Sequence, residues 1–300
     1  MRPLRPVLLL GPGRGGTTLL YKLLSLHRDA AFVSNFDTHM VARMFVRPAL
    51  WVSNAAWRIR RWAWFSAEGQ AYQAYLLHRS LLKRFVPAPV EGESLYSSCG
   101  VTLNEYAQPA DAVTRNALRT TFAAVQDRHL GRVLLLKRTA NNRRIPVLYS
   151  AFPECKTIVL WRDGRAVTAS LLNVHWWLDH PVWWADGKTP RQMNLDRQQS
   201  IEIAARNWVE EIEAIERGLA RADARPVMQV RYEDMLARPK ETISSILEFI
   251  GLDVSEEYLR HLQSLDLRPA TQSWRTSMTQ AEIRAIERIG RSQLRRLSYC

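Results

Sequence analysis

The residues best placed to do chemistry lie in a glycine-rich stretch near the start of the chain. Residues 7–10 are apolar and predict a short buried strand, and residues 11–18, GPGRGGTT, lead into an apolar-periodic run that predicts a helix. Glycines let backbone N–H groups converge on a phosphate, and the helix N-terminus adds partial positive charge. The stretch therefore predicts a phosphate-binding loop.

The spacing of this loop matches a Walker A motif, G-x-x-x-x-G-K-[ST], with one departure. Thr17 stands where that motif has its lysine. A nucleotide triphosphatase uses the lysine to hold the β- and γ-phosphates and the next hydroxyl to hold magnesium. We therefore expect a loop that holds a phosphate without hydrolysing ATP; a glycine-rich turn without a ligand is the alternative.

Cationic side chains follow two further predicted strands. Residues 133–136 (VLLL) are followed by Lys137, and residues 156–161 (KTIVLW) are followed by Arg162. Ligands of open α/β sheets bind at the carboxyl ends of the strands. We expect Lys137 and Arg162 to lie in the same crevice as the glycine loop.

The net charge of +13 is compatible with nucleic acid, an acidic membrane surface or an anionic cofactor. The arginines are scattered through predicted helices rather than massed in one block, which argues against a nucleic-acid tail. Cys99, Cys155 and Cys300 are isolated, which indicates a reducing compartment and no zinc site. We expect no cleavable signal before the first strand, and no apolar run reaches the ~18 residues of a membrane span.

The predicted elements alternate between strand and helix. Asp111 is a plausible N-cap for a helix that runs to about Leu130, with Gly131 as its stop. Asn141 and Asn142, and later Trp274 and Arg275, are expected on loops. Further helices are expected at about 145–152, 166–173, 197–220, 239–250 and from 280, and further strands at 31–33 and 227–230. The pattern predicts one α/β domain over residues 1–300, with a central parallel sheet flanked by helices.

Two segments are unusually rich in aromatic residues. Residues 45–85 mix tryptophan, phenylalanine and tyrosine with arginine, which is typical either of an interfacial membrane helix or of a helical lid packed on the domain. Residues 174–195 contain Trp176, Trp177, Trp183 and Trp184 in an irregular loop. Such a loop inside a compact domain is more often functional than not.

Four segments together resemble the sulfotransferases that use 3′-phosphoadenosine-5′-phosphosulfate (PAPS). They cover most of the chain in the order that the family has them. They are GRGGTTLL at 13–20, LKRTANNRR at 136–144, FPECKTIVLWRDGRAVTAS at 152–170 and VRYEDMLARPKETISSILEFIGL at 230–252. The resemblance implies a P-loop-like fold and PAPS as the sulfuryl donor.

The resemblance also implies roles for individual residues. Arg162 and Ser170 resemble the pair that grips the 3′-phosphate, and Tyr232 resembles a residue beside the nucleotide. Arg275, with Trp274, is similar to a late pair that closes over the phosphates. Lys137 resembles the lysine of the tyrosyl-protein branch that sits at the bridging oxygen. Independently of the resemblance, a sulfuryl group carries less negative charge than a phosphoryl group, so Lys137 and Arg14 can suffice without magnesium. The family's 5′-phosphosulfate loop corresponds to Arg14, Gly15, Gly16, Thr17, Thr18 and Leu19.

The chain departs from these relatives where a general base is expected. The tyrosyl-protein branch has a glutamate where this chain has Asn35, and Asp37 and His39 are the nearest titratable substitutes. Asp37 as a helix cap and His39 as a helix-face residue are the ordinary alternatives, and a residue of the 174–195 loop is another candidate for the base. Three charged residues near the predicted site could have structural roles instead. Arg165 could pair with an acidic neighbour at the sheet edge, and Glu233 and Asp234 could cap the helix that follows them rather than contact the nucleotide.

We expect a bacterial, cytoplasmic transferase that needs no metal, binds no nucleic acid and is compatible with peripheral membrane contact. Its acceptor is expected to be a lipid, glycolipid, quinone or phenolic metabolite, because the tryptophan-rich segments could form an aromatic pocket. The alternatives are a P-loop nucleotide kinase-like transferase and a non-catalytic nucleotide-binding module. The sequence indicates neither the oligomeric state nor whether the 45–65 segment meets membrane or acceptor.

Overall fold

A computed structural model describes residues 3–38, 42–55, 57–65, 85–103, 108–221, 225–265, 267 and 274–300. Its five described strands form one parallel sheet in the order β2-β3-β1-β4-β5. The strands are β1 (Pro6–Leu10), β2 (Ala30–Phe32), β3 (Val133–Lys137), β4 (Lys156–Trp161) and β5 (Val227–Arg231). The predicted α/β class with a parallel sheet flanked by helices is confirmed.

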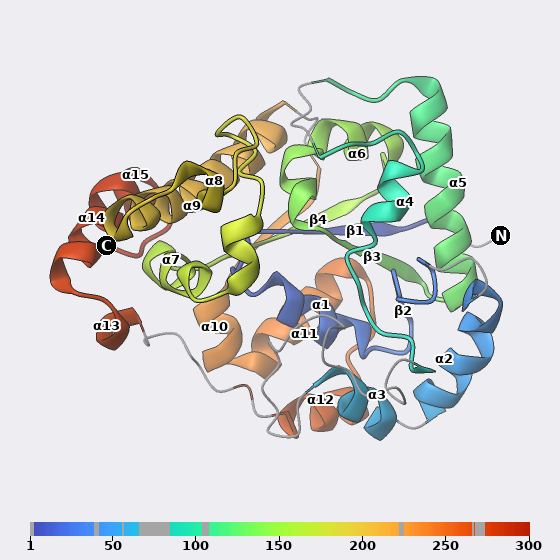
Figure 1. Ribbon diagram of the computed structural model, residues 1–300. Helices are drawn as coiled ribbons and strands as arrows, with labels where there is room; N and C mark the ends of the chain where they lie inside the picture. The colour runs from blue at the N-terminus through green and yellow to red at the C-terminus, as the bar shows by residue number, and fades with distance from the viewer. Residues whose placement is uncertain are drawn as a thin grey trace.

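Helices connect the strands and cover both faces of the sheet (Figure 1). Short 3₁₀ helices lie at η1 (Ala42–Phe45), η3 (Thr139–Arg143) and η4 (His175–Asp179). The α-helices are α1 (Thr17–Ser25), α2 (Val46–Ala55), α3 (Trp57–Trp64), α4 (Glu93–Ser97), α5 (Ala112–His129), α6 (Ile145–Ala151), α7 (Gly164–Leu172), α8 (Pro190–Met193), α9 (Arg197–Ala220), α10 (Tyr232–Ala237), α11 (Pro239–Ile250), α12 (Glu256–Gln263), α13 (Trp274–Ser277), α14 (Gln280–Ile289) and α15 (Arg291–Arg296).

The central strand β1 divides the core into two halves because successive side chains point to opposite faces of the sheet. Val7 and Leu9 belong to a buried cluster with residues of α1 and α11, whereas Leu8 and Leu10 belong to a second cluster with residues of α5, α6 and α9. Burial on both faces explains why the strand reads as a continuous apolar run.

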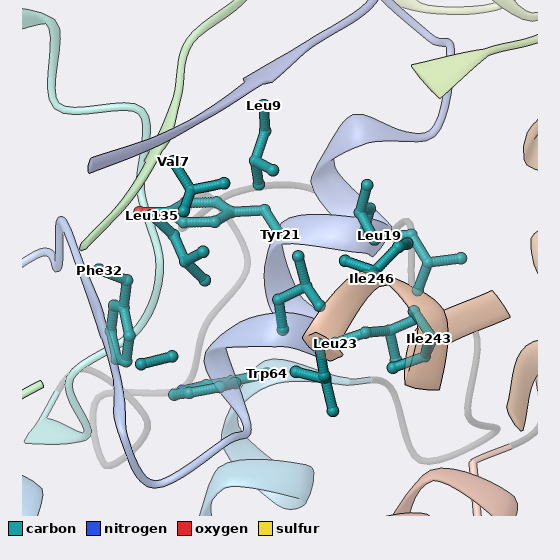
Figure 2. Close-up of a cluster of buried hydrophobic side chains, with 14 of the residues drawn as sticks. Val7, Leu9, Leu19, Tyr21, Leu23, Phe32, Trp64, Leu135, Ile243 and Ile246 are labelled. Carbon is teal, nitrogen blue, oxygen red and sulfur yellow. The ribbon is translucent and has the colours of Figure 1, made fainter. Parts of the chain in front are cut away.

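The helix that follows the glycine loop is held between the sheet and α11. Figure 2 shows Leu19 and Leu23 of α1 lying toward Ile243 and Ile246 of α11. The Tyr21 hydroxyl, on the same helix, accepts from the Val33 backbone N–H at 2.9 Å. These contacts fix the direction of α1, and hence the position of the loop at its N-terminus.

Several predicted boundaries are corrected by the structure. Helix α5 begins at the predicted cap, with Asp111 accepting from Thr114 N, but its left-handed C-cap is Leu130 rather than Gly131. Gly131 is needed for a close approach instead, since a Cβ there would lie 2.4 Å from Ala31 N. Asn141 and Asn142 lie in η3 rather than on a loop, and Trp274 and Arg275 lie in α13.

The aromatic segment after β2 is helical where the structure describes it. In α3, Trp64 is buried and its indole N–H donates to Pro87 O, and Arg60 is buried with its guanidinium over the Trp64 ring. Trp62 and Phe45 are exposed. The segment therefore packs on the domain and also presents aromatic side chains outward. Residues 66–84 lie outside the described part of the chain, and no described helix is long and apolar enough to cross a membrane.

Candidate active site

The glycine loop joins β1 to α1 at the carboxyl edge of the sheet, with β3 on one side of β1 and β4 on the other. Arg14 and Gly16 both have left-handed backbone conformations, with φ of 65° and 92°. A Cβ at Gly16 would also lie 2.3 Å from the Tyr232 ring, so this position requires glycine for two reasons. Tyr232 therefore packs directly against the predicted phosphate loop.

Four of the predicted nucleotide-binding residues meet beside this loop. The Arg14 Nε–H donates to Ser170 Oγ at 3.0 Å, and an Arg162 guanidinium N–H donates to the Arg14 carbonyl at 2.8 Å. The Arg162 guanidinium lies 4.4 Å from the centroid of the Tyr232 ring. Three separate parts of the sequence thus bring two cations, a hydroxyl and an aromatic face to one place.

Arg162 is held there with an unused donor. Its residue is 9% exposed, and within the described residues its Nε–H is a buried group without a hydrogen-bond partner. Leaving a buried donor unsatisfied is costly, so such a group is often completed by a ligand. An anion beside Arg162 would satisfy it.

The remaining loop residues divide between ligand and core. Thr17 is buried and Thr18 is half-buried at the start of α1. The Leu19 side chain belongs to the apolar core, so its backbone is the part that remains for the loop. Arg275 is exposed in α13 with its guanidinium 4.5 Å from the Trp274 ring centroid.

The predicted lysine, Lys137, ends strand β3 one strand away from the glycine loop. Its side chain is 4% exposed, and its ammonium group forms an ion pair with Glu91. Arg138 pairs with the other oxygen of Glu91, and also with Glu93. Glu93 in turn pairs with the fully buried Arg144.

Sequence reasoning missed Glu91. The only signal was its location in a loop marked by Pro87, Pro89 and Gly92, because its partner Lys137 lies 46 positions away along the chain. Burial raises the pKa of the Glu91 carboxyl, but the charges of Lys137 and Arg138 outweigh it and lower the pKa to about 2. Glu91 is therefore ionised at neutral pH, and its carboxylate lies beside the carboxyl end of β3.

The predicted base Asp37 lies in a buried cluster. None of its side chain is exposed, and it accepts hydrogen bonds from the Ser34 hydroxyl at 2.6 Å and Arg128 Nε at 3.0 Å, with His129 Nε2 at 2.9 Å. Burial raises the pKa of Asp37, but hydrogen bonds and charge from His129 and Ser34 lower it to about 2. These contacts favour a structural role over the predicted one. His39 lies outside the described residues.

Arg165, Glu233 and Asp234, for which structural roles were the alternative, all contact other parts of the protein. Arg165 pairs with Asp163 and Glu287 and donates to the Tyr299 carbonyl. Glu233 accepts from the Asp163 backbone N–H and from the Tyr299 hydroxyl, in the first turn of α10. Asp234 forms an exposed pair with Arg238.

The tryptophan-rich loop is tied to the glycine loop through buried polar groups. The Trp183 indole N–H donates to Glu211 at 2.9 Å, and Asn142 donates to the same carboxylate at 2.6 Å. Asn142 also accepts from Gly11 N and donates to Gly11 O. Burial raises the pKa of Glu211. No spacing pattern in the sequence indicates this connection.

His180 of the same loop is influenced by the charges around Glu91. The pKa of His180 is lowered by burial and then by the charges of Arg138 and Arg143, while the charge of Glu91 opposes this. Nearby in the loop, Trp177 is buried, and Trp176 and Leu178 are 49% and 43% exposed. Among the residues that the structure describes, no group of three or more His, Cys, Asp or Glu could hold a metal ion.

Comparison with known proteins gives a consistent result. The model of the sulfotransferase family matches residues 6–256. The omega-hydroxy-beta-dihydromenaquinone-9 sulfotransferases Stf3 of Mycobacterium bovis and Mycobacterium tuberculosis are each 26% identical over 148 residues, which is 48% of this chain and 36% of theirs. The chain thus spans little more than a third of the length of those curated relatives.

Solved structures show the same fold. Sulfotransferase STF9 from Mycobacterium avium aligns with 97% of this chain and 76% of its own, at 16% identity and a TM-score of 0.54. The sulfotransferase domain from the curacin biosynthetic pathway aligns with 98% of both chains, at 15% identity and a TM-score of 0.53.

Proposed function

Because the chain belongs to the sulfotransferase family, we propose that it transfers the sulfuryl group of PAPS to a hydroxyl of an apolar or amphiphilic acceptor. The observation that carries this proposal is the meeting of Arg14, Arg162, Ser170 and Tyr232 beside a glycine loop. The acceptor is a lipid, glycolipid, quinone or phenolic compound.

The donor set suits a nucleotide with anionic groups at both ends. The backbone of the glycine loop and the N-terminus of α1 would hold the 5′-phosphosulfate. Arg162 and Ser170 would hold the 3′-phosphate, and the buried unpartnered Nε–H of Arg162 supports this assignment. The Tyr232 ring, packed on Gly16, forms an aromatic wall beside the loop.

The chemistry follows from where the cations lie. The acceptor oxygen bonds to sulfur while the bond from sulfur to the 5′-phosphate oxygen breaks, and that oxygen leaves with the electron pair. Lys137, buried at the end of β3, would neutralise the leaving oxygen. A sulfuryl group carries less negative charge than a phosphoryl group, so this site can act with Thr17 in place of the Walker lysine.

An amphiphilic acceptor is supported by the tryptophan-rich loop. Trp176 and Leu178 are exposed close to His180 in the sequence. The pKa of His180 is influenced by the charges of Arg138 and Glu91. The curated relatives named above act, by their printed name, on a hydroxylated dihydromenaquinone. A screen with radiolabelled PAPS should therefore favour hydroxylated quinones and phenols over hydrophilic saccharides, and the reverse preference would contradict the acceptor class.

The deciding experiment is calorimetric titration with 3′-phosphoadenosine-5′-phosphate (PAP) in the absence of magnesium. We expect a Kd of about 1 μM or below for the unsubstituted protein, and binding weaker by roughly 10- to 100-fold in Arg162→Ala, because a charge-assisted contact is lost. Arg275→Ala is a useful companion, since it tests whether the exposed cation of α13 contributes.

The competing functions are separated by titration or by the transfer assay. A kinase-like transferase would bind ATP as well as PAP and would require magnesium. A non-catalytic module would bind PAP tightly but would transfer no sulfuryl group, and Lys137→Ala would leave its function intact.

A further inference from the structure

We propose that Glu91 is the general base, which takes the proton from the acceptor hydroxyl during the sulfuryl transfer proposed above. The juxtaposition that carries this inference is the contact of its carboxylate with the ammonium group of Lys137. Lys137 would stand at the leaving oxygen, so a carboxylate in contact with it lies close to the sulfuryl group, where it could accept the proton of an approaching acceptor hydroxyl.

Hydrogen bonds between the segment that follows β2 and residues 88–90 hold Glu91 at this position. Beyond β2, Val33 O accepts from Val90 N at 2.8 Å, and Ser34 pairs with Pro89 in an antiparallel bridge. Asn35 adds two hydrogen bonds to this pairing: its side-chain oxygen accepts from Ala88 N at 2.7 Å, and its backbone N–H donates to Ala88 O at 3.1 Å. Glu91 is the next residue after this pairing.

This arrangement gives Asn35 a new meaning. Asn35 stands where the tyrosyl-protein relatives have their glutamate, but here its amide anchors the 87–92 loop. The loop then supplies a carboxylate from another part of the chain. In this proposal, Glu91 takes the role that the resemblance gives to the residue at the position of Asn35.

Access separates Glu91 from Asp37. The Glu91 side chain is 21% exposed, whereas the Lys137 side chain is 4% exposed and the Asp37 side chain is fully buried. An acceptor hydroxyl can therefore approach Glu91 but cannot reach Asp37. A general base must come within hydrogen-bond distance of the proton that it removes.

The ion pair also explains how the base becomes active. Lys137 and Arg138 hold the pKa of Glu91 low against the effect of burial. When an anionic donor attracts Lys137, one of these two charges is withdrawn and burial raises the pKa. In the transfer, the acceptor oxygen bonds to sulfur, its proton passes to Glu91, and the leaving oxygen departs with its electron pair beside Lys137.

The test compares Glu91→Gln with Glu93→Gln. Both remove one negative charge from the same cluster, but Glu93 contacts Arg138 and Arg144, and glutamine keeps an oxygen that can accept from them. Sulfuryl transfer is followed as PAP formed from PAPS, with 2-naphthol as probe acceptor and with water as acceptor in its absence. PAP affinity is measured in parallel by calorimetry.

We expect Glu91→Gln to slow transfer by about 10²- to 10⁴-fold, the usual contribution of a general base. It should still bind PAP, and its residual rate should rise steeply with pH as the acceptor ionises without help. Glu91→Ala should be partly rescued by added formate. Glu93→Gln should keep its rate within about threefold and keep the unsubstituted pH profile, because glutamine keeps an oxygen that can accept from Arg138 and from the buried Arg144.

Three results would overturn the inference. Glu91→Gln with an unchanged rate would exclude Glu91 as the base. A matching loss in His180→Gln, with Glu91→Gln unaffected, would assign the base to His180. Loss of PAP binding in Glu91→Gln would mean that Glu91 holds the donor site. Failure of the unsubstituted protein to form PAP, although it binds PAP, would overturn the proposed function itself.

Discussion

The two sides of the candidate site are built in different ways. The proposed donor side consists of residues that follow β1, β4 and β5 along the chain, so Gly16, Arg162 and Tyr232 are positioned by their own strands. The proposed acceptor side is assembled from distant segments. Glu91 of the 87–92 loop pairs with Lys137 at the end of β3, and Glu211 of α9 accepts from Asn142 of η3 and from Trp183 of the tryptophan-rich loop. Strand ends fix donor residues locally, whereas acceptor residues depend on contacts between distant segments.

Lys137 lies on the border between the two sides, and its removal should have the largest effect of the changes considered below. We expect Lys137→Met to slow transfer by roughly 10²- to 10³-fold, because the leaving oxygen loses its cation. PAP affinity should change far less. Pre-steady-state transfer and calorimetry on the same variant test this, and an equal loss of affinity would place Lys137 wholly on the donor side.

Asp37 should matter for stability rather than for chemistry. Its pKa is lowered from 3.8 to about 2 in the folded protein, so it stabilises the fold above pH 4 and loses that contribution as the pH falls toward 2. The shift corresponds to about 2 kcal/mol of unfolding free energy.

Urea unfolding of Asp37→Asn at pH 7 and pH 3 measures this contribution. The variant should be less stable at pH 7, and its stability should fall less than that of the unsubstituted protein between the two values. Transfer by the folded variant should be preserved. A transfer loss as large as that expected for Glu91→Gln would show that Asp37 belongs to the reacting groups.

Trp183→Phe should have the smallest effect on stability and on PAP affinity, and it tests whether the two sides of the site are separate. The change removes the hydrogen bond to Glu211 and keeps a ring under the Arg143 guanidinium. We expect a loss of about 1 kcal/mol in stability. PAP affinity, measured by calorimetry, should fall by only about twofold, and a tenfold loss would contradict the separation of the two sides.

The positions of the candidate donor residues at the strand ends could be predicted from the sequence for a physical reason. Short apolar runs locate the buried strands, and the residue after each run necessarily lies at the carboxyl edge of a parallel sheet. Lys137 and Arg162 follow from this alone, and Ser170 lies on the helix after β4. The meeting of Arg14 with Ser170 needed only adjacent strands.

The acceptor side could not be predicted in the same way. Glu91 and Lys137 are 46 positions apart, and Trp183 and Glu211 are 28 apart, so no local pattern connects them. Gly131 illustrates the same limit. It must be glycine because it lies close to Ala31 of β2, a strand about 100 positions earlier in the chain, and no local pattern around Gly131 indicates that contact. Tertiary packing decides such pairs, and sequence spacing does not record it.

The path from Gly11 through Asn142 and Glu211 to Trp183 has a thermodynamic consequence. An acceptor that moves Trp183 would change the hydrogen bonds at the first residue of the glycine loop. Linkage then requires reciprocity: the factor by which such an acceptor alters the affinity for the nucleotide equals the factor by which the nucleotide alters the affinity for the acceptor. The strength of this coupling between the two substrates would then depend on the Glu211 carboxylate, which accepts from both Asn142 and Trp183.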